Sequence, residues 1–276
     1  MKIKFAETAS GDTLAVPAYS RTTLSDPATA LDEKTGGAIS RAIKASRFKG
    51  EAGDVVEIVS PNGVDAARIV VFGLGESKDA DGNVFEKAGA SVVKHLLNTG
   101  ADTVSFHLDG VTDTESAART ALGATMAAYR FDAYRTKLKA DKKPSLKTAE
   151  FVVSDEKAAK KSWKSWEAVA DGVKTARDLV MEPANILYPT AYTKRVKEKL
   201  EKLGVEIEVL GEKEMEKLGM GALLAVGQGS DSPSKVVVMK WMGGGDEAPL
   251  ALVGKGVVFD TGGISLKPGA GMEDMT

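Results

Sequence analysis

The chain contains no cysteine among its 276 residues and only two histidines, His95 and His107. The absence of cysteine excludes disulfide bonds and thiolate metal sites, which is typical of a protein from a reducing compartment. Two histidines are too few for a histidine-rich metal site. A metal ion would therefore have to be held mainly by oxygen ligands or by an unusual donor.

Long apolar runs and an excess of one charge are also missing. No run approaches the roughly 18 apolar residues that a membrane-spanning helix needs, and the amino terminus lacks the apolar core of a signal peptide. The net charge is −2, which gives no bulk attraction to nucleic acid. We therefore expect a cytoplasmic protein without a membrane partner, and a nucleic-acid partner is disfavoured.

The first half of the chain alternates short apolar runs with helical patterns. Phe85, Ala88, Val92 and Leu96 follow a helical spacing within 84–97. Such alternation predicts an α/β domain with a largely parallel or mixed sheet. The ranges expected to form strands are 2–6, 13–19, 55–60, 68–72, 103–108 and 151–153, and those expected to form helices are 84–97 and 114–129.

The second half begins with a long helical pattern at 156–179, which could join two domains. A helix is expected from Pro189 to Gly204, the latter at its C-cap, followed by a strand near 205–209 and a short helix at 212–218. Runs 235–241 and 250–253 are predicted to pair as antiparallel strands, because the connection is too short for a helical crossover. The expected division is an N-terminal α/β domain (1–155), a linker helix (156–180) and the start of a second α/β domain (181–276).

Two weak motifs invite other functions. Gly73-Leu-Gly75 follows a predicted strand, as in a dinucleotide-binding turn, but Lys78 occupies the place of the third glycine. The basic stretch Lys137 to Lys147 is either a solvated connection or the contact surface of a nucleotide- or nucleic-acid-binding module. A salt-sensitive DNA shift of the N-terminal half would support the binding module.

The most informative segment lies near the carboxyl terminus. The apolar run Leu250 to Val253 leads into a glycine-rich stretch that carries Lys255, Asp260 and Lys267. Charged residues after a buried strand lie where open α/β sheets usually place their sites. Singly, each could be a solvated loop residue or a turn cap. Together, between closely spaced glycines, they favour a metal site.

Phe259-Asp-Thr-Gly262 also has the form of an aspartic-protease motif. That mechanism needs two carboxylates that share a proton, and the chain has one such motif. Two nearby lysines would favour the ionised carboxylate and so remove the shared proton. The alternation of helices and strands also disagrees with an all-β protease.

Three stretches together resemble the cytosolic leucyl aminopeptidase family, the two-metal exopeptidases of the M17 type. The first runs from Val253 to Pro268 (VGKGVVFDTGGISLKP) and continues with Met272 to Met275. The second runs from Ala176 to Asn185 with Pro189-Thr190, and the third, Gly219 to Ser230, resembles the loop and strand that follow in the family. The resemblance is strong from about residue 170 and diffuse before it.

The resemblance implies roles for four residues. Lys255 aligns with a metal-ligating lysine, Asp260 with a carboxylate that bridges two metal ions, and Lys267 with a catalytic lysine that acts on the substrate. Met275 aligns with a residue that lines the pocket for the first side chain of the substrate. The implied cofactors are two divalent ions, Mn²⁺ or Zn²⁺ with Mg²⁺ as a further candidate. The implied partners are peptide substrates and further copies of the chain in a homo-hexamer.

The chemistry of this set is coherent. A lysine binds a metal only as the neutral amine, which a nearby dication and partial burial both favour. Two adjacent divalent ions can bind the amino terminus of a peptide and activate a water molecule for attack. A protonated Lys267 would polarise the scissile carbonyl and stabilise the oxyanion that develops.

The resemblance also implies ligands that this sequence does not contain, including an aspartate just past Thr276 and an aspartate, a glutamate and an arginine further downstream. One lysine and one aspartate do not satisfy two ions that each take four to six ligands. We therefore expect a truncated catalytic domain that is inactive by itself and binds metal poorly. A natural short homologue without catalytic activity is the alternative.

Overall fold

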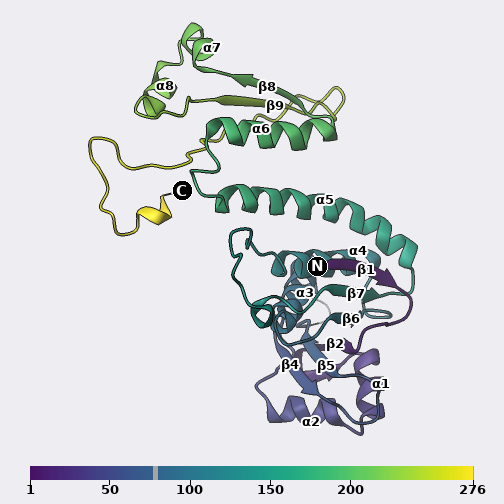
Figure 1. Ribbon diagram of the computed structural model, residues 1–276. Coiled ribbons are helices and arrows are strands. Elements are labelled where there is room, and N and C mark those ends of the chain that lie inside the picture. The colour runs from purple at the N-terminus through teal and green to yellow at the C-terminus, as the bar shows by residue number, and fades with distance from the viewer. Residues whose placement is uncertain (77–79, 276) are drawn as a thin grey trace. The chain divides into compact units, whose positions relative to one another are not determined.

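The computed structural model describes residues 1–76 and 80–275, and the chain divides into two compact units, 1–174 and 175–276 (Figure 1). This division falls inside the long helix that was expected to link two domains. The predicted domain limits at 155 and 180 stay a prediction.

Unit 1 is a mixed sheet with helices on both faces. Its strands lie in the order β1-β7-β6-β2-β5-β4, with β3 paired to β2. The pairs β1–β7, β7–β6, β6–β2 and β2–β5 are parallel, whereas β4 and β3 are antiparallel to their neighbours. The strands are β1 (Lys2–Ala6), β2 (Thr13–Tyr19), β3 (Thr23–Leu24), β4 (Val55–Val59), β5 (Arg68–Gly73), β6 (Thr103–His107) and β7 (Thr148–Val152).

The sequence explains the position of the central strands. β5 is buried along almost its whole length, which is typical of a parallel strand covered on both faces. In β2, pairing with β6 covers only Thr13 to Ala15. Pro17, which has no N–H to donate, follows the point where this ladder ends. The two neighbouring strands therefore separate toward their carboxyl ends.

Each face of the sheet has its own hydrophobic core. Helices α3 (Gly82–Leu96) and α4 (Thr114–Ala127) pack on one face against Phe72, Phe106 and Phe151. Helices α1 (Asp26–Lys34) and α2 (Ala38–Ala45) pack on the other face. The mixed α/β fold expected from the sequence is confirmed, and so are the predicted strands of this half to within a few residues. Helices α1 and α2 were not predicted.

Helix α5 (Glu156–Met181) is fixed to unit 1 at its first turns. Trp163 is buried against Phe5, with ring centroids 6.4 Å apart. The Trp166 Nε1 donates a hydrogen bond to Glu115 at 2.7 Å, and the Arg119 guanidinium lies 4.3 Å from the Trp166 ring centre. Both tryptophans therefore pack within unit 1.

Unit 2 contains helices around a two-stranded antiparallel sheet of β8 and β9. Gly204 has the left-handed conformation (φ 81°) expected of a C-cap glycine. The elements are α6 (Pro189–Leu200), β8 (Glu206–Leu210), α7 (Glu212–Lys217), α8 (Gly221–Gly227) and β9 (Val236–Lys240).

Two sequence predictions for unit 2 are wrong. Residues 250–253 form no strand, and β9 pairs with β8 rather than with them. Leu250, Leu252 and Val253 are 84, 87 and 98% exposed. An apolar strand needs a neighbouring strand for its backbone groups, and none of the described residues provides one for this run. In addition, residues 221–227 are helical, although the family resemblance led us to expect a strand there.

Phe106 lies at the centre of the hydrophobic core beneath α3 and α4, so its replacement tests the packing of this core. Its ring stacks on Phe151 with centroids 4.8 Å apart and contacts the edge of Phe72 at 5.9 Å. Phe106→Ala should lower the free energy of unfolding by about 3–5 kcal/mol, because a large cavity remains. Urea unfolding followed by circular dichroism measures this loss. The control Val59→Ala, at a residue 58% exposed, should change it by only about 0.5 kcal/mol. Equal losses for the two variants would contradict this packing.

Glu150 is a carboxylate buried within the sheet (3% exposed). Burial by itself would raise its pKa, but hydrogen bonds from the Ser10 backbone and hydroxyl and from the Ser105 hydroxyl, with the charge of Lys4, lower the pKa below its ordinary value. A lowered folded-state pKa stabilises the fold above the ordinary pKa, and this contribution is lost as the pH falls through the folded-state pKa.

Glu150→Gln should therefore cost about 1–3 kcal/mol at neutral pH, because the amide leaves donors without a charged acceptor. The difference in the free energy of unfolding between wild type and variant should shrink as the pH falls below the ordinary pKa of glutamate. Urea unfolding at a series of pH values provides the comparison. A difference that grows on acidification would disprove the role assigned to the carboxylate.

Candidate functional site

The four residues singled out in the sequence all lie in the irregular segment 250–275 of unit 2. Among its described residues the one helical turn is η5 (Met272–Asp274), and Lys255 is exposed. Gly262 and Gly263 have φ values of 91° and 61°, which allow the chain to reverse direction after Asp260. Lys267 returns to this turn, since its backbone N–H donates to the Thr261 carbonyl at 2.9 Å.

The turn brings three of the predicted residues together. Lys267 Nζ lies 3.2 Å from Asp260 Oδ2, and it also donates to Met275 Sδ at 3.3 Å. The Asp260 backbone N–H donates to the Met275 carbonyl at 3.2 Å. A carboxylate, an ammonium group and an apolar side chain thus share one small region. Lys255 acts on Asp260 only through its charge.

The electrostatics keep Asp260 ionised. Its pKa lies below the ordinary value, first because the Gly262 backbone N–H donates to Oδ1 at 2.8 Å and next because of the Lys267 hydrogen bond and charge. The charge of Lys255 adds a smaller effect in the same direction. An ionised carboxylate is the form that a metal ion requires.

The donors in this segment are of the types that bind divalent cations, but there are too few of them to complete a site. The carboxylate of Asp260 and the amine of Lys255 are an oxygen and a nitrogen donor. In the part of the chain that the structure describes, no group of three His, Asp or Glu side chains could hold a metal ion. These residues therefore do not complete a two-metal site.

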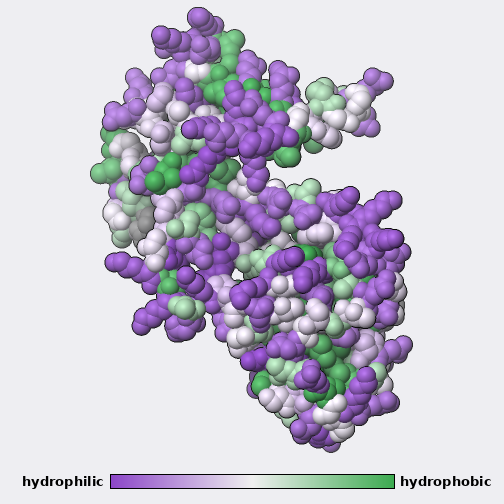
Figure 2. All heavy atoms as spheres, turned by 45° about the vertical axis from the view of Figure 1, so that its right-hand side comes forward, coloured by the Kyte–Doolittle hydropathy of each residue, from purple (hydrophilic) through white to green (hydrophobic). Residues whose placement is uncertain are grey.

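Apolar side chains around this segment remain exposed. Val257, Phe259, Ile264 and Leu266 are 46, 43, 107 and 71% exposed. Figure 2 shows patches of hydrophobic side chains between hydrophilic ones on one face of the molecule. So many exposed apolar side chains in one segment are unusual for the surface of a folded protein. They indicate a surface that packs against groups outside the described residues.

Most of the chain matches two known protein domains. Residues 15–138 match the N-terminal domain of the cytosol aminopeptidase family, and residues 174–276 match its catalytic domain. A probable cytosol aminopeptidase of Caulobacter vibrioides is 48% identical over the whole of this chain. This chain belongs to the cytosol aminopeptidase family. A probable cytosol aminopeptidase of Rhizobium etli is 47% identical over 87% of this chain.

The chain spans about half the length of the relatives it matches. It covers 56% of the Caulobacter protein and 49% of the Rhizobium protein. The match to the catalytic domain contains the whole segment 250–275. The family resemblance proposed from this segment is confirmed, and the roles of its individual residues stay predictions.

Solved structures agree with the fold. A mutant of tomato leucine aminopeptidase superposes with a TM-score of 0.73 at 23% identity, over 86% of this chain and 50% of that chain. The bottromycin maturation enzyme BotP, solved in complex with Mn, has a TM-score of 0.69 at 28% identity, over 95% of this chain and 51% of that chain. Among the described residues, no helix combines the length and the apolar composition that crossing a membrane requires.

The weak dinucleotide motif has a structural explanation. A side chain at Gly73 would collide with the backbone of Gly50 and Glu51, and Gly75 has a φ of 72°. The Gly75 N–H donates to the Gly50 carbonyl at 2.8 Å, and its own carbonyl accepts from Ser20. Both glycines therefore allow the end of β5 to pack closely against the backbone near Ser20 and Gly50. Lys78 lies outside the described residues.

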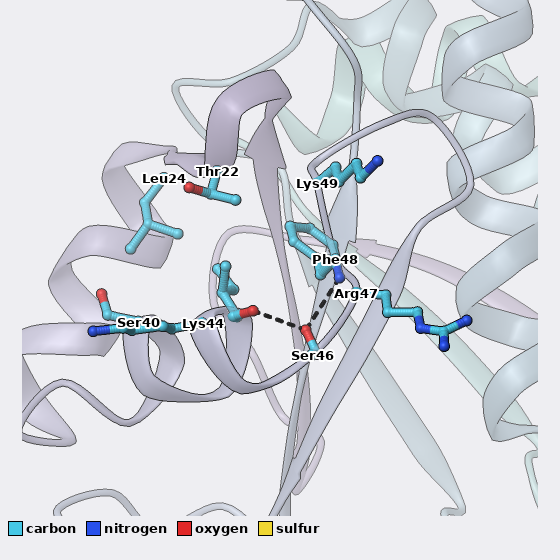
Figure 3. A pocket seen from close by; sticks show the side chains of 9 residues that line it. Thr22, Leu24, Ser40, Lys44, Ser46, Arg47, Phe48 and Lys49 are labelled. Carbon is cyan, nitrogen blue, oxygen red and sulfur yellow. Dashed lines mark hydrogen bonds between the residues drawn. The ribbon is translucent and has the colours of Figure 1, made fainter.

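A cavity of about 560 Å³ lies next to α2 in unit 1, but its cations do not form an anion site (Figure 3). Lys44, Arg47 and Lys49 line it. Figure 3 shows the Arg47 and Lys49 side chains pointing in different directions. Phosphate recognition needs donors that converge on one point, so we assign no function to this cavity.

The ion pair at the turn makes a direct prediction. Lys267→Gln should raise the pKa of the Asp260 carboxyl toward its ordinary value, because both a hydrogen bond and a positive charge are lost. Lys255→Gln should raise it less, since that lysine contributes charge only. Titration of the carboxyl carbon by NMR measures both pKa values. A larger shift in the Lys255 variant would contradict the contacts of Asp260 in the turn.

Proposed function

We propose that this chain provides the N-terminal domain and the opening part of the catalytic domain of a metal-dependent aminopeptidase. The enzyme would release N-terminal residues, preferentially leucine-like ones, from peptides in the cytoplasm. The observation that carries the proposal is the contact between Lys267 and the ionised Asp260, inside the segment matched to the catalytic domain.

Each residue has a part that suits its chemistry. Asp260 offers two carboxylate oxygens and Lys255 a neutral amine, the donors that would hold divalent ions, Mn²⁺ or Zn²⁺ with Mg²⁺ as a further candidate. When bound, such ions supply Lewis acidity and a nucleophilic water at neutral pH. Lys267, as the catalytic lysine, donates a hydrogen bond to the carbonyl oxygen of the scissile peptide bond. Met275, in contact with Lys267, presents an apolar wall to the first side chain of the substrate.

The remaining donors would come from the part of the family's length that this chain does not span. By itself the 276-residue chain would then be inactive. The complete enzyme would assemble as a homo-hexamer, as the family resemblance implies, and its partners would be peptides rather than nucleic acids or membranes.

A fusion of this chain to the carboxyl-terminal half of the Caulobacter relative tests the function. We expect the fusion to hydrolyse leucyl-p-nitroanilide with Mn²⁺ or Zn²⁺, and the chain by itself to be inactive. A folded, metal-loaded fusion without activity toward any aminoacyl anilide would refute the proposal.

Within the fusion, Lys267→Ala should lower kcat by about 10²–10³, because one oxyanion donor is lost, while metal content stays the same. Lys255→Ala should instead lower the metal content. Lys213→Ala, at an exposed lysine of α7, is the matched control and should change neither. Full turnover in the Lys267 variant, or full metal content in the Lys255 variant, would contradict the role assigned to that residue.

A further inference from the structure

A second cavity, of about 440 Å³, opens at the carboxyl edge of the sheet in unit 1. Its walls come from residues at or after the ends of four parallel strands. This volume lies within the range of sites for small ligands. The wall residues at those four strand ends are Tyr19 (β2), Leu74 (after β5), Thr112 (after β6) and Ser154 (after β7).

The topology explains why a cavity forms at this place. After β2 the chain enters α1 and α2, which pack on one face of the sheet. After β6, the neighbour of β2, it enters α4 on the opposite face. The two connections diverge, and the ladder between the strands ends at Ala15 and Phe106. Open α/β sheets bind ligands in the crevice outside such a pair of strand ends.

The described lining combines apolar side chains (Leu74, Ala80, Phe85 and Val111) with hydrogen-bonding groups and one negative charge. Hydroxyls of Tyr19, Thr112, Ser116 and Ser154 are present, and no lysine or arginine is among the described residues that line the cavity. Asp113 adds a carboxylate that also caps α4, since its Oδ1 accepts from the Ser116 N–H at 2.7 Å. A carboxylate has about four lone-pair sites, so acceptor capacity remains after capping. The charge disfavours a phosphate ligand.

We propose that this cavity binds a small neutral molecule with adjacent hydroxyl groups, a free pentose or a nucleoside, whose diol donates hydrogen bonds to Asp113. The diol is the chemistry shared by both sources. The cavity is formed by residues of unit 1, whereas the segment 250–275 belongs to unit 2. This proposal therefore does not depend on the aminopeptidase function.

The 276-residue chain can be titrated with ribose, adenosine, 2′-deoxyadenosine and AMP, with the backbone amides of Gly110 to Ser116 followed by NMR. We expect saturable shifts with ribose or adenosine. Binding of 2′-deoxyadenosine should be weaker by about tenfold or more, because the diol is lost. Equal binding of ribose and adenosine would identify a pentose site, and tighter adenosine binding a nucleoside site.

Asp113→Asn is the informative variant, because asparagine caps a helix as well as aspartate does. It should weaken adenosine or ribose binding by about tenfold. Asp102→Asn removes a carboxylate just before β6, at the opposite end of the strand, and should leave affinity unchanged. Ser154→Leu, at an exposed position, should abolish binding by filling the mouth of the cavity.

Three results would overturn the proposal. They are the absence of saturable shifts at the solubility limit of both diol ligands, tighter binding of AMP than of adenosine, and unchanged affinity in both the Asp113 and the Ser154 variant.

Discussion

The structure of unit 1 depends on the parallel pairing of β2 with β5 on one side and with β6 on the other. Buried parallel strands need helices on both faces, because neither face tolerates water. The connections after β2 and β6 supply these helices on opposite faces. The two cores and the cavity at the carboxyl edge therefore follow from one arrangement of three strands.

Unit 2 shows what happens when such pairing is missing. Its described sheet has only two strands, and a two-stranded sheet has marginal stability without further packing. The apolar run 250–253 finds no neighbouring strand among the described residues and stays exposed. The turn that carries Asp260 and Lys267 is nevertheless closed by its own hydrogen bonds. Local interactions thus hold together part of the segment that matches the family's catalytic domain. The contacts that would bury this segment are absent from the described residues.

Much of the first unit could be predicted from the sequence, because its strands are short apolar runs and its longer helices keep a clear period. Helices α1 and α2 escaped prediction, since they are short and separated by only a few residues that include Gly36 and Gly37. Residues 250–253 were predicted to be a strand from composition, yet a strand also needs a partner, which composition does not reveal.

The candidate site was also only partly predictable from the sequence. The sequence directly shows Lys255, Asp260 and Lys267 and their spacing between glycines. This pattern was sufficient to recognise the resemblance to the family. The contact between Lys267 and Asp260, and that between Lys267 and Met275, depend on the left-handed glycines of the turn, so the spacing gave no distances. The cavity at the sheet edge was not predicted, because its walls come from four strand ends that are far apart in sequence.

We propose that this chain carries part of a two-metal aminopeptidase site without all of the donors that complete it. Calorimetric titration of the 276-residue chain with Mn²⁺ and Zn²⁺ tests this claim most directly. We predict weak binding without a defined stoichiometry, because one carboxylate and one amine are too few ligands. Tight binding of two ions per chain, abolished in Asp260→Asn, would show that the site is already complete and would contradict the claim.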